Sequence, residues 1–448
     1  RGVCAEWGQK ARPDPVTPLG PDGTALAHLL SDLSQHIHSD SFAQAARLAQ
    51  YPNAFTRSRK LPLPHLIGAL ISQRGSSLQV MLDSFFASLA SDVDGTSLCA
   101  LGHVRGVSER AFAKARSHLD GNALHGLNAR LLASADALVP RWRGRRVVAA
   151  DASVLMPAVR ACHRVRVASA DQRLFALYLP GAELCLHARV HGAQVPERQM
   201  LFEALESLGS GDVVVLDRGY PASWLVAHLV ERGIGFCMRC DKANGWVAMR
   251  EFLQSHQDEA IVQLRAPSAQ DAKDYECSGA APWVRLVRCI SSTGQVRVMA
   301  TNLPAQDFPA AVFGDLYHQR WRIEEAFKRL KHRLKLECVS GLTQQALLVD
   351  VAAKVLADNL AALVCMAVQT NHQLQSEDRV CNRAYAAVVM QRWLPGVLVL
   401  MQGLQSLQER IAHAIGLLGK NLVRRVAGRS QPRPVRHVKP HPHMAYKG

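Results

Sequence analysis

Acidic residues are the scarcer charge in this chain of 448 residues, with 37 Asp and Glu against 53 Lys and Arg and a net charge of +16. The shortage excludes an acidic protein and favours a polyanionic partner such as DNA, RNA or an anionic membrane. Hydrophobic residues make up 48% and charged residues 20% of the chain, a balance typical of a globular protein rather than a disordered one. The length suffices for about two to four domains.

The chain also lacks a long apolar run that is free of charges. The most apolar region, residues 346–368, is interrupted by Asp350, Lys354 and Asp358, which predicts a buried helix rather than a membrane span. Residues 1–18 are polar and show no signal-peptide pattern. We therefore expect a cytoplasmic protein without a membrane partner.

Paired cysteines at metal-binding spacing are scarce as well. The chain has 11 cysteines, an odd number, and its one CxxC motif, Cys237 to Cys240, has no second pair at zinc-finger spacing. We expect reduced thiols in a cytoplasm, with the CxxC motif on a half-buried strand over residues 235–240.

Two apolar runs of this sequence each end in an aspartate. Residues 147–150 precede Asp151, and residues 213–216 precede Asp217. Short apolar runs bounded by turns and helices are typical of buried strands in a mixed α/β sheet. Each aspartate alone is equally well explained as a turn former at the end of a strand.

A third acid lies in the pattern Tyr317-x2-Arg320-x3-Glu324-x6-Lys331. On a helix turning about 100° per residue, these four side chains fall within about 60° of arc. An adjoining apolar stripe can seal the helix onto a core, and it consists of Ile323, Phe327, Leu330 and Leu334. We expect one helix over residues 308–334; the simpler alternative is an amphipathic helix with a solvated charged face.

Carboxylates that converge at one edge of a sheet raise one another's pKa unless cations compensate them. Asp151, Asp217 and Glu324 offer hard oxygen ligands, which suit Mg²⁺ or Mn²⁺ better than zinc. Two such ions about 4 Å apart can stabilise both the attacking and the leaving oxygen in phosphoryl transfer. The conjunction of both aspartates with the helix motif therefore predicts a site for phosphoryl transfer.

These motifs resemble those of the DDE transposases of the bacterial insertion sequence 4 family, which have a ribonuclease-H-like catalytic core. The resemblance rests on Asp151, on Asp217 in the run Val-Val-Leu-Asp-Arg-Gly-Tyr, and on the Tyr-Arg-Glu-Lys signature. It covers about residues 45–370. The long separation between Asp217 and Glu324 is accommodated in this family by a β-rich insertion, which the strand-like segments after residue 241 indicate independently.

The resemblance implies a role for each of these residues. Asp151, Asp217 and Glu324 would be the catalytic residues and would bind two Mg²⁺ ions, for which Mn²⁺ can substitute. Arg320 and Lys331 would contact phosphates near the cleavage point, and Tyr317 would hold the terminal phosphate or a displaced base. Further phosphate contacts would come from Lys328 and Arg218. Glu325 points about 100° away from Glu324 on the helix, so Glu324 is the preferred ligand.

The resemblance also implies partners and a reaction. Such a protein would bind the inverted repeats at the ends of a transposon, cleave them, and join the freed 3′-hydroxyl ends to target DNA. It would act as a homodimer assembled on DNA, in the bacterial cytoplasm and in association with the nucleoid.

The expected fold class is α/β, with a ribonuclease-H-like mixed-sheet core, a β-rich insertion, and helical regions on both sides. The expected segments are a helical, DNA-binding N-terminal domain (1–140), the first part of the core (141–240), the insertion (241–300), the second part of the core with the signature helix (301–345), a C-terminal helical region (346–426) and a basic disordered tail (427–448).

Two other functions remain open at this stage. One is a catalytically inactive DNA-binding protein derived from a transposase, although the three acids are all present. The other is a ribonuclease-H-like nuclease without a strand-transfer step, against which the large helical flanks and the insertion argue.

Overall fold

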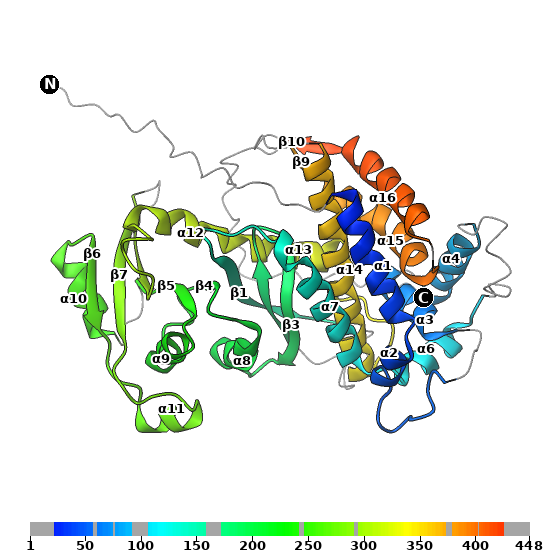
Figure 1. Ribbon diagram of the computed structural model, residues 1–448. Coiled ribbons are helices and arrows are strands. Elements are labelled where there is room, and N and C mark those ends of the chain that lie inside the picture. Colours follow the sequence, from blue (N-terminus) through cyan, green and yellow to red (C-terminus); the bar gives the residue numbers. More distant parts are fainter. Residues whose placement is uncertain are drawn as a thin grey trace.

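The computed structural model describes most of the chain and is shown in Figure 1. The described residues are 22–56, 61–74, 77–91, 106–157, 172–241, 246–290, 294–372, 379–401 and 403–424. The tail expected over residues 427–448 lies outside them.

A single eight-stranded sheet forms the centre of the catalytic half, with the strand order β3-β2-β1-β4-β5-β8-β7-β6. The strands are β1 (Arg146–Leu155), β2 (Gln172–Leu179), β3 (Leu184–Gly192), β4 (Asp212–Leu216), β5 (Gly235–Arg239), β6 (Glu259–Gln263), β7 (Trp283–Ile290) and β8 (Val296–Thr301). Strands β1, β2 and β3 are antiparallel neighbours, whereas β4 and β5 run parallel to β1. This mixed arrangement confirms the expected α/β class and is consistent with a ribonuclease-H-like core.

The insertion continues the core sheet. Strand β8 pairs antiparallel with β5, and β7 and β6 follow as the next antiparallel strands. Two helices, α10 (Val247–Ser255) and α11 (Ala269–Asp274), accompany these strands. In Figure 1 this part forms the end of the sheet farthest from the helical half.

Alternating side chains of β4 and its neighbours pack against helices on opposite faces of the sheet, as the two-residue period of a strand requires. Val213 and Val215 pack in one cluster with Phe313 and Leu316 of α12 (Phe313–Gln319). The intervening Val214 belongs to the main core, together with residues of α8 (Glu197–Ala204) and α9 (Ser223–Glu231). The sheet is therefore covered on both faces, as Figure 1 shows.

The helices before and after the core join into one bundle around α14. The earlier helices are α1 (Gly23–Ile37), α2 (Asp40–Ala45), α3 (Leu63–Ser72), α4 (Leu78–Ser91), α6 (Glu109–Ser117) and α7 (Gly121–Ala135), and the later ones are α14 (Gln344–Asn371), α15 (Arg383–Val399) and α16 (Leu404–Gly419). Polar contacts also join the two sets: the Gln391 side chain donates to the Ser72 carbonyl over 2.9 Å. A small antiparallel pair, β9 (Arg379–Cys381) with β10 (Leu422–Arg424), adjoins the bundle.

Helix α14 is long and apolar enough to cross a membrane by length and composition, yet almost all of its apolar stretch is buried within the protein. Its charged residues have partners inside: Lys354 donates to the carbonyls of Lys335 and Cys338, both over 2.7 Å, and Asp358 binds Arg329. The expectation of a buried helix is confirmed.

Two secondary-structure predictions need correction. The single helix expected over residues 308–334 is a 3-10 turn (Ala310–Val312) followed by α12 and then by α13 (Trp321–His332), with Arg320 at the junction. Strand β2 was not predicted, because periodicity alone does not distinguish its short apolar run, residues 174–179, from a segment of buried helix.

Candidate active site

Asp151, on β1, lies level with Asp217, which directly follows the neighbouring strand β4. The parallel register of β1 and β4 pairs Val148 with Val214 and Ala149 with Val215, so two residues further along each chain the aspartates stand side by side. Asp151 was expected to end its strand, but β1 continues beyond it to Leu155 by pairing with β2. What ends before Asp151 is the pairing with β4, and this leaves its side chain beside the turn that holds Asp217.

Arg320 draws the third acid into this cluster. Its guanidinium donates to Asp151 Oδ2 and to Glu324 Oε1, each over 3.2 Å. The Arg320 side chain is only 8% exposed, whereas the Asp151 and Glu324 side chains are 19% and 25% exposed. The structure thus brings an acid from β1 and an acid from α13 together around one buried cation.

A tight turn after β4 shapes the position of Asp217. Its Oδ1 accepts a hydrogen bond from the Gly219 backbone N–H over 2.7 Å. A Cβ atom at residue 219 would stand 3.0 Å from the same oxygen, so a larger residue would push the carboxylate away. Glycine follows Arg218 for this steric reason, and the turn fixes the Asp217 carboxylate at the edge of the sheet.

The electrostatics of the cluster favour a further cation. Burial raises the pKa of Asp151 from 3.8 to about 6, an effect that Arg320 and the Ala152 N–H only partly offset and that Asp217 and Glu324 reinforce. One guanidinium is too little compensation for this number of carboxylates.

Two further groups belong to this cluster, and no motif in the sequence marks them. Glu197, in the first turn of α8, has a raised pKa because of burial and of the neighbouring Asp151 and Asp217 carboxylates, and it lies 3.6 Å from Arg173. The Tyr220 side chain is fully buried next to the same acids, and its hydroxyl has no hydrogen-bond partner among the described residues. Only the packing of α8 against β1 places the Glu197 carboxylate next to the two aspartates.

The signature residues take different places around the cluster. The Tyr317 ring is buried in the core beneath the sheet, and its hydroxyl interacts with Arg239. The Arg320 guanidinium stands 5.9 Å from the centre of that ring. Lys331 donates to the Val154 carbonyl and lies 3.3 Å from Glu337 Oε1, so it secures the end of β1.

The remaining cations predicted for the site are more exposed. Lys328 lies 2.6 Å from Glu325, and both side chains are largely exposed, at 59% and 66%. Glu325 therefore points away from the cluster, in agreement with its angle on the helix. Arg218 is exposed next to Asp217, where it borders the carboxylates without joining the buried ion pairs that are described.

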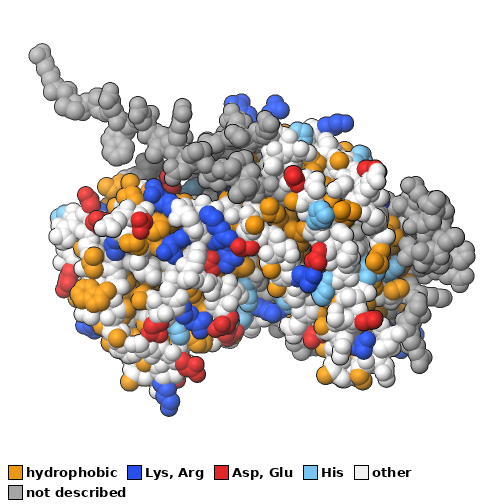
Figure 2. All heavy atoms as spheres, viewed as in Figure 1, with side chains coloured by type: hydrophobic (Ala, Val, Ile, Leu, Met, Phe, Trp, Pro, Cys, Tyr) orange, Lys and Arg blue, Asp and Glu red, His pale blue; other side chains and the backbone are white. Residues whose placement is uncertain are grey.

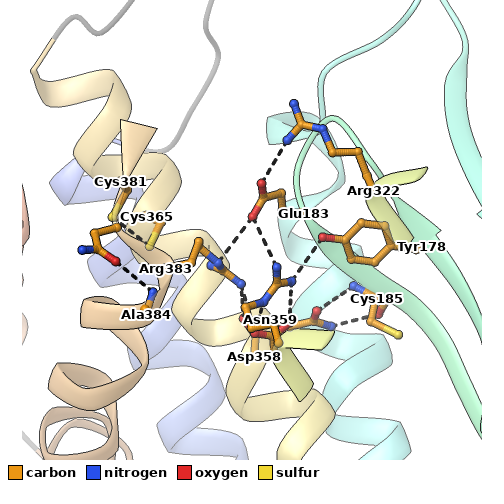
Figure 3. Close-up of polar contacts among 12 residues, drawn as sticks. Tyr178, Glu183, Cys185, Arg322, Asp358, Asn359, Cys365, Cys381, Arg383 and Ala384 are labelled. Atoms are coloured by element: carbon orange, nitrogen blue, oxygen red, sulfur yellow. Dashed lines mark hydrogen bonds and ion pairs between the residues drawn. The ribbon is translucent and has the colours of Figure 1, made fainter. Parts of the chain in front are cut away.

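The opposite side of α13 carries a second ionic network, which Figure 3 shows. Arg329 binds Asp358 of α14 through two hydrogen bonds of 2.8 Å and also donates to the Tyr178 hydroxyl. Arg383 of α15 binds the same Asp358 over 3.0 Å. Glu183, in the turn between β2 and β3, lies 3.1 Å from Arg322. This network ties the core to the helical bundle.

The carboxylate cluster offers the hard oxygen donors that divalent magnesium or manganese prefers. Among the described residues, no three His, Cys, Asp or Glu side chains stand close enough together to hold a metal ion as they are placed. The Arg320 guanidinium lies between Asp151 and Glu324 and supplies the positive charge there. The carboxylate oxygens are therefore suitable ligands for a divalent ion, and in this structure the Arg320 guanidinium lies between the carboxylates of Asp151 and Glu324.

The mixed sheet is consistent with a ribonuclease-H-like core, and it carries acids on β1 and directly after β4, with a third acid on α13. Residues 142–360 match the family model described as the transposase DDE domain. The matched region includes Asp151, Asp217 and Glu324. A search of curated proteins gives no match for this chain. Fold and family match together support a DDE transposase.

Proposed function

We propose that this protein cleaves the ends of a transposon by metal-dependent hydrolysis of phosphodiester bonds and joins the freed 3′-hydroxyl ends to target DNA. The observation that carries the proposal is the Arg320 guanidinium held between Asp151 and Glu324, level with Asp217. Three acids from distant segments share one buried cation. That arrangement is costly for folding alone, because burial of like charges is unfavourable, and it is useful for binding cations.

Asp151, Asp217 and Glu324 would hold two Mg²⁺ ions, or Mn²⁺ in their place, and Glu197 is a fourth carboxylate within the same cluster. When bound, such ions activate a water molecule and stabilise charge on the phosphate. Other residues of the chain position the carboxylates for that chemistry. The turn at Gly219 holds the Asp217 carboxylate, and Arg320 holds the carboxylates of Asp151 and Glu324 next to each other.

The DNA contacts follow from the surrounding cations. Arg218 and Lys328 are exposed beside the cluster and would bind backbone phosphates. Lys331 and Arg320 would contact the phosphates nearest to the cleavage point, while the buried Tyr317 ring would act through the Arg320 guanidinium that stands over it. Phosphate contacts fix the register of a duplex without reading its sequence, so recognition of the inverted repeats is assigned to the N-terminal helices.

The net charge of +16 supports a DNA partner, and Figure 2 shows Lys and Arg side chains over the middle of the molecule and along its upper edge. We further propose membership of the insertion sequence 4 family, action as a homodimer on DNA, and a cytoplasmic, nucleoid-associated location. The spacing of the Tyr-Arg-Glu-Lys signature supports the family assignment.

The experiment is a cleavage and joining assay with purified full-length protein, Mg²⁺ and DNA that carries the element's own ends. Wild type should cut at the ends and join them to a target plasmid, and Glu324→Gln should lose both steps while still binding the DNA. Glu325→Gln is the matched control, because it removes the neighbouring but outward-facing carboxylate and should keep activity within about twofold.

The outcomes separate the alternatives. Cleavage without joining would show a nuclease that lacks the strand-transfer step. Binding without cleavage by the wild type would show an inactive DNA-binding descendant. Equal activity of wild type and Glu324→Gln would remove Glu324 from the site.

A further inference from the structure

Two buried cysteines meet where β9 leaves the helical bundle. Cys365 lies on α14 and Cys381 is the last residue of β9. Their Sγ atoms are 3.0 Å apart, and both thiols are free. Figure 3 shows the two side chains pointing at each other across the gap between these elements.

This thiol pair is reachable in spite of its burial. Each cysteine is 4% exposed, yet both line a cleft of about 1190 Å³ between α13, α14 and the start of α15. Arg329 and Arg383 line the same cleft. A small reagent that enters the cleft therefore meets the two sulfur atoms together and in a positively charged setting, which favours a thiolate.

The local chemistry makes one sulfur the attacking group. The hydrogen bond from Cys381 lowers the pKa of Cys365 below the ordinary value of a thiol, although burial opposes this, and Arg383 adds to the effect. The same hydrogen bond, together with burial, raises the pKa of Cys381. Glu183 is the acid that faces the pair, and it disfavours the thiolate. Elsewhere, burial raises the pKa of Cys185 and Cys289 and leaves them less reactive.

We propose that Cys365 and Cys381 form a reversible intramolecular disulfide that anchors β9 to α14. The oxidant is a low-molecular-weight disulfide. The Cys365 thiolate attacks one of its sulfur atoms and expels one thiolate, and the Cys381 sulfur then attacks Cys365 Sγ and expels the second. The two protons released by the cysteines end on the two leaving thiols, so one small disulfide is reduced for each protein disulfide formed.

The disulfide would also restrain the elements next to the two cysteines. Cys381 pairs with Leu422 in the β9–β10 register, and Arg383, two residues on, binds Asp358 and lies 3.4 Å from Glu183. Linking Cys381 to α14 therefore fixes the small sheet and the arginine that closes the network behind α13. Such transient disulfides are compatible with a reducing compartment, where they serve as redox sensors.

The test uses full-length protein incubated with oxidised glutathione, alkylated, digested with trypsin without reduction, and analysed by mass spectrometry. Trypsin cuts after Lys354, Arg379 and Arg383, so the expected product is peptide 355–379 linked to peptide 380–383. The linked peptide should disappear on reduction, be lost in Cys381→Ser, and persist in the matched control Cys277→Ser, which removes a half-buried cysteine outside the cleft. Circular dichroism verifies that each variant is folded.

A second measurement follows the reactivity of Cys365 in the folded, reduced protein. Its alkylation by iodoacetamide should be half-maximal at a pH below the ordinary pKa of a thiol, and Cys381→Ala should move this midpoint to higher pH by removing the hydrogen-bond donor. The proposal is overturned if folded wild type yields no linked peptide, if other cysteine pairs link instead, or if Cys381→Ala leaves the midpoint unchanged. None of these results depends on cleavage activity.

Discussion

Ion pairs between arginine and aspartate lie on both sides of helix α13, but the pKa of the aspartate is raised on one side and lowered on the other. On one side, burial raises the pKa of Asp151 to about 6, and Arg320 is the nearest cation for a group of acids. On the other side, burial would likewise raise the pKa of Asp358, but Arg329 and Arg383 more than offset it, and the pKa is lowered. Asp358 is buried and Asp151 is partly buried, yet the pKa shift is in the opposite direction, because the ratio of cations to acids differs between the two sites.

This contrast separates a structural ion network from a candidate catalytic one. The carboxylate of Asp358 is fully compensated by two guanidinium groups, Arg329 of α13 and Arg383 of α15, and these ion pairs join both helices to α14. The Asp151 cluster keeps uncompensated negative charge next to solvent, which costs stability and leaves capacity for cations. Strain of this kind is expected where a protein binds a ligand.

The largest expected effect is a loss of catalysis on substitution of the acids in the Asp151 cluster. Asp217→Asn and Asp151→Asn should each lower DNA-end cleavage by at least about 10³-fold, because each removes a charged donor from the site. DNA binding should change little, as a gel-shift assay can verify. Asp315→Asn, which neutralises an exposed acid on α12, serves as control. Near-normal cleavage by either variant would exclude that residue from catalysis.

On the compensated side the expected effect is on stability. Asp358→Ala should lower the free energy of unfolding by about 3–5 kcal/mol, because it leaves the buried Arg329 and Arg383 without their counter-ion. Urea unfolding followed by circular dichroism measures the change. A loss below about 1 kcal/mol, the range of an exposed ion pair, would show that the network contributes little to the fold.

The pH dependence of stability should distinguish the two sides further. Because the pKa of Asp151 is raised in the folded protein, its contribution is favourable below about pH 4 and is lost as pH rises through about 6. Asp151→Asn resembles the protonated form, so it should stabilise the protein by on the order of 2 kcal/mol at about pH 8 and by nothing at about pH 4. Urea unfolding in metal-free buffer at both pH values tests this. A stabilisation that does not change with pH would contradict it.

The smallest effect is expected at the edge of the cluster. Lys331→Ala removes a cation that is tied to Glu337 and Val154, so DNA-end affinity should fall only several-fold. The slope of log affinity against log salt should decrease by about one if Lys331 contacts a phosphate. Lys273→Ala, on α11 at the far end of the sheet, should leave the slope unchanged. Equal slopes for Lys331→Ala and wild type would assign Lys331 a purely structural part.

Much of the fold was predictable where the signal is local. The apolar runs before Asp151 and Asp217 are strands of the sheet, and Ser108 caps α6 by accepting from the Ala111 N–H. The apolar stripe of the signature helix, represented by Ile323 and Phe327, is buried as expected. Such features depend on neighbours within one or two helical turns, and hydrophobic periodicity therefore reveals them.

Other features depend on contacts between distant segments. Strand β2 pairs on both sides with other strands, and this pairing, not the periodicity of its short apolar run, distinguishes it from a segment of buried helix. Arg320, at the junction of α12 and α13, reaches both Asp151, 169 residues away, and Glu324. Spacing along a helix could indicate the second contact but not the first.

The sequence by itself determined the chemical types and spacing of Asp151, Asp217 and Glu324, together with the strands before the two aspartates and the helix that carries Glu324, because local hydrophobic pattern and charge specify these features. Only the tertiary structure decided that Glu197 and Tyr220 join them, that Arg329 faces away into a compensated network, and that Cys365 meets Cys381. The physical reason is that burial and the sum of nearby charges set these properties, and both are known only once segments far apart in the chain have packed together.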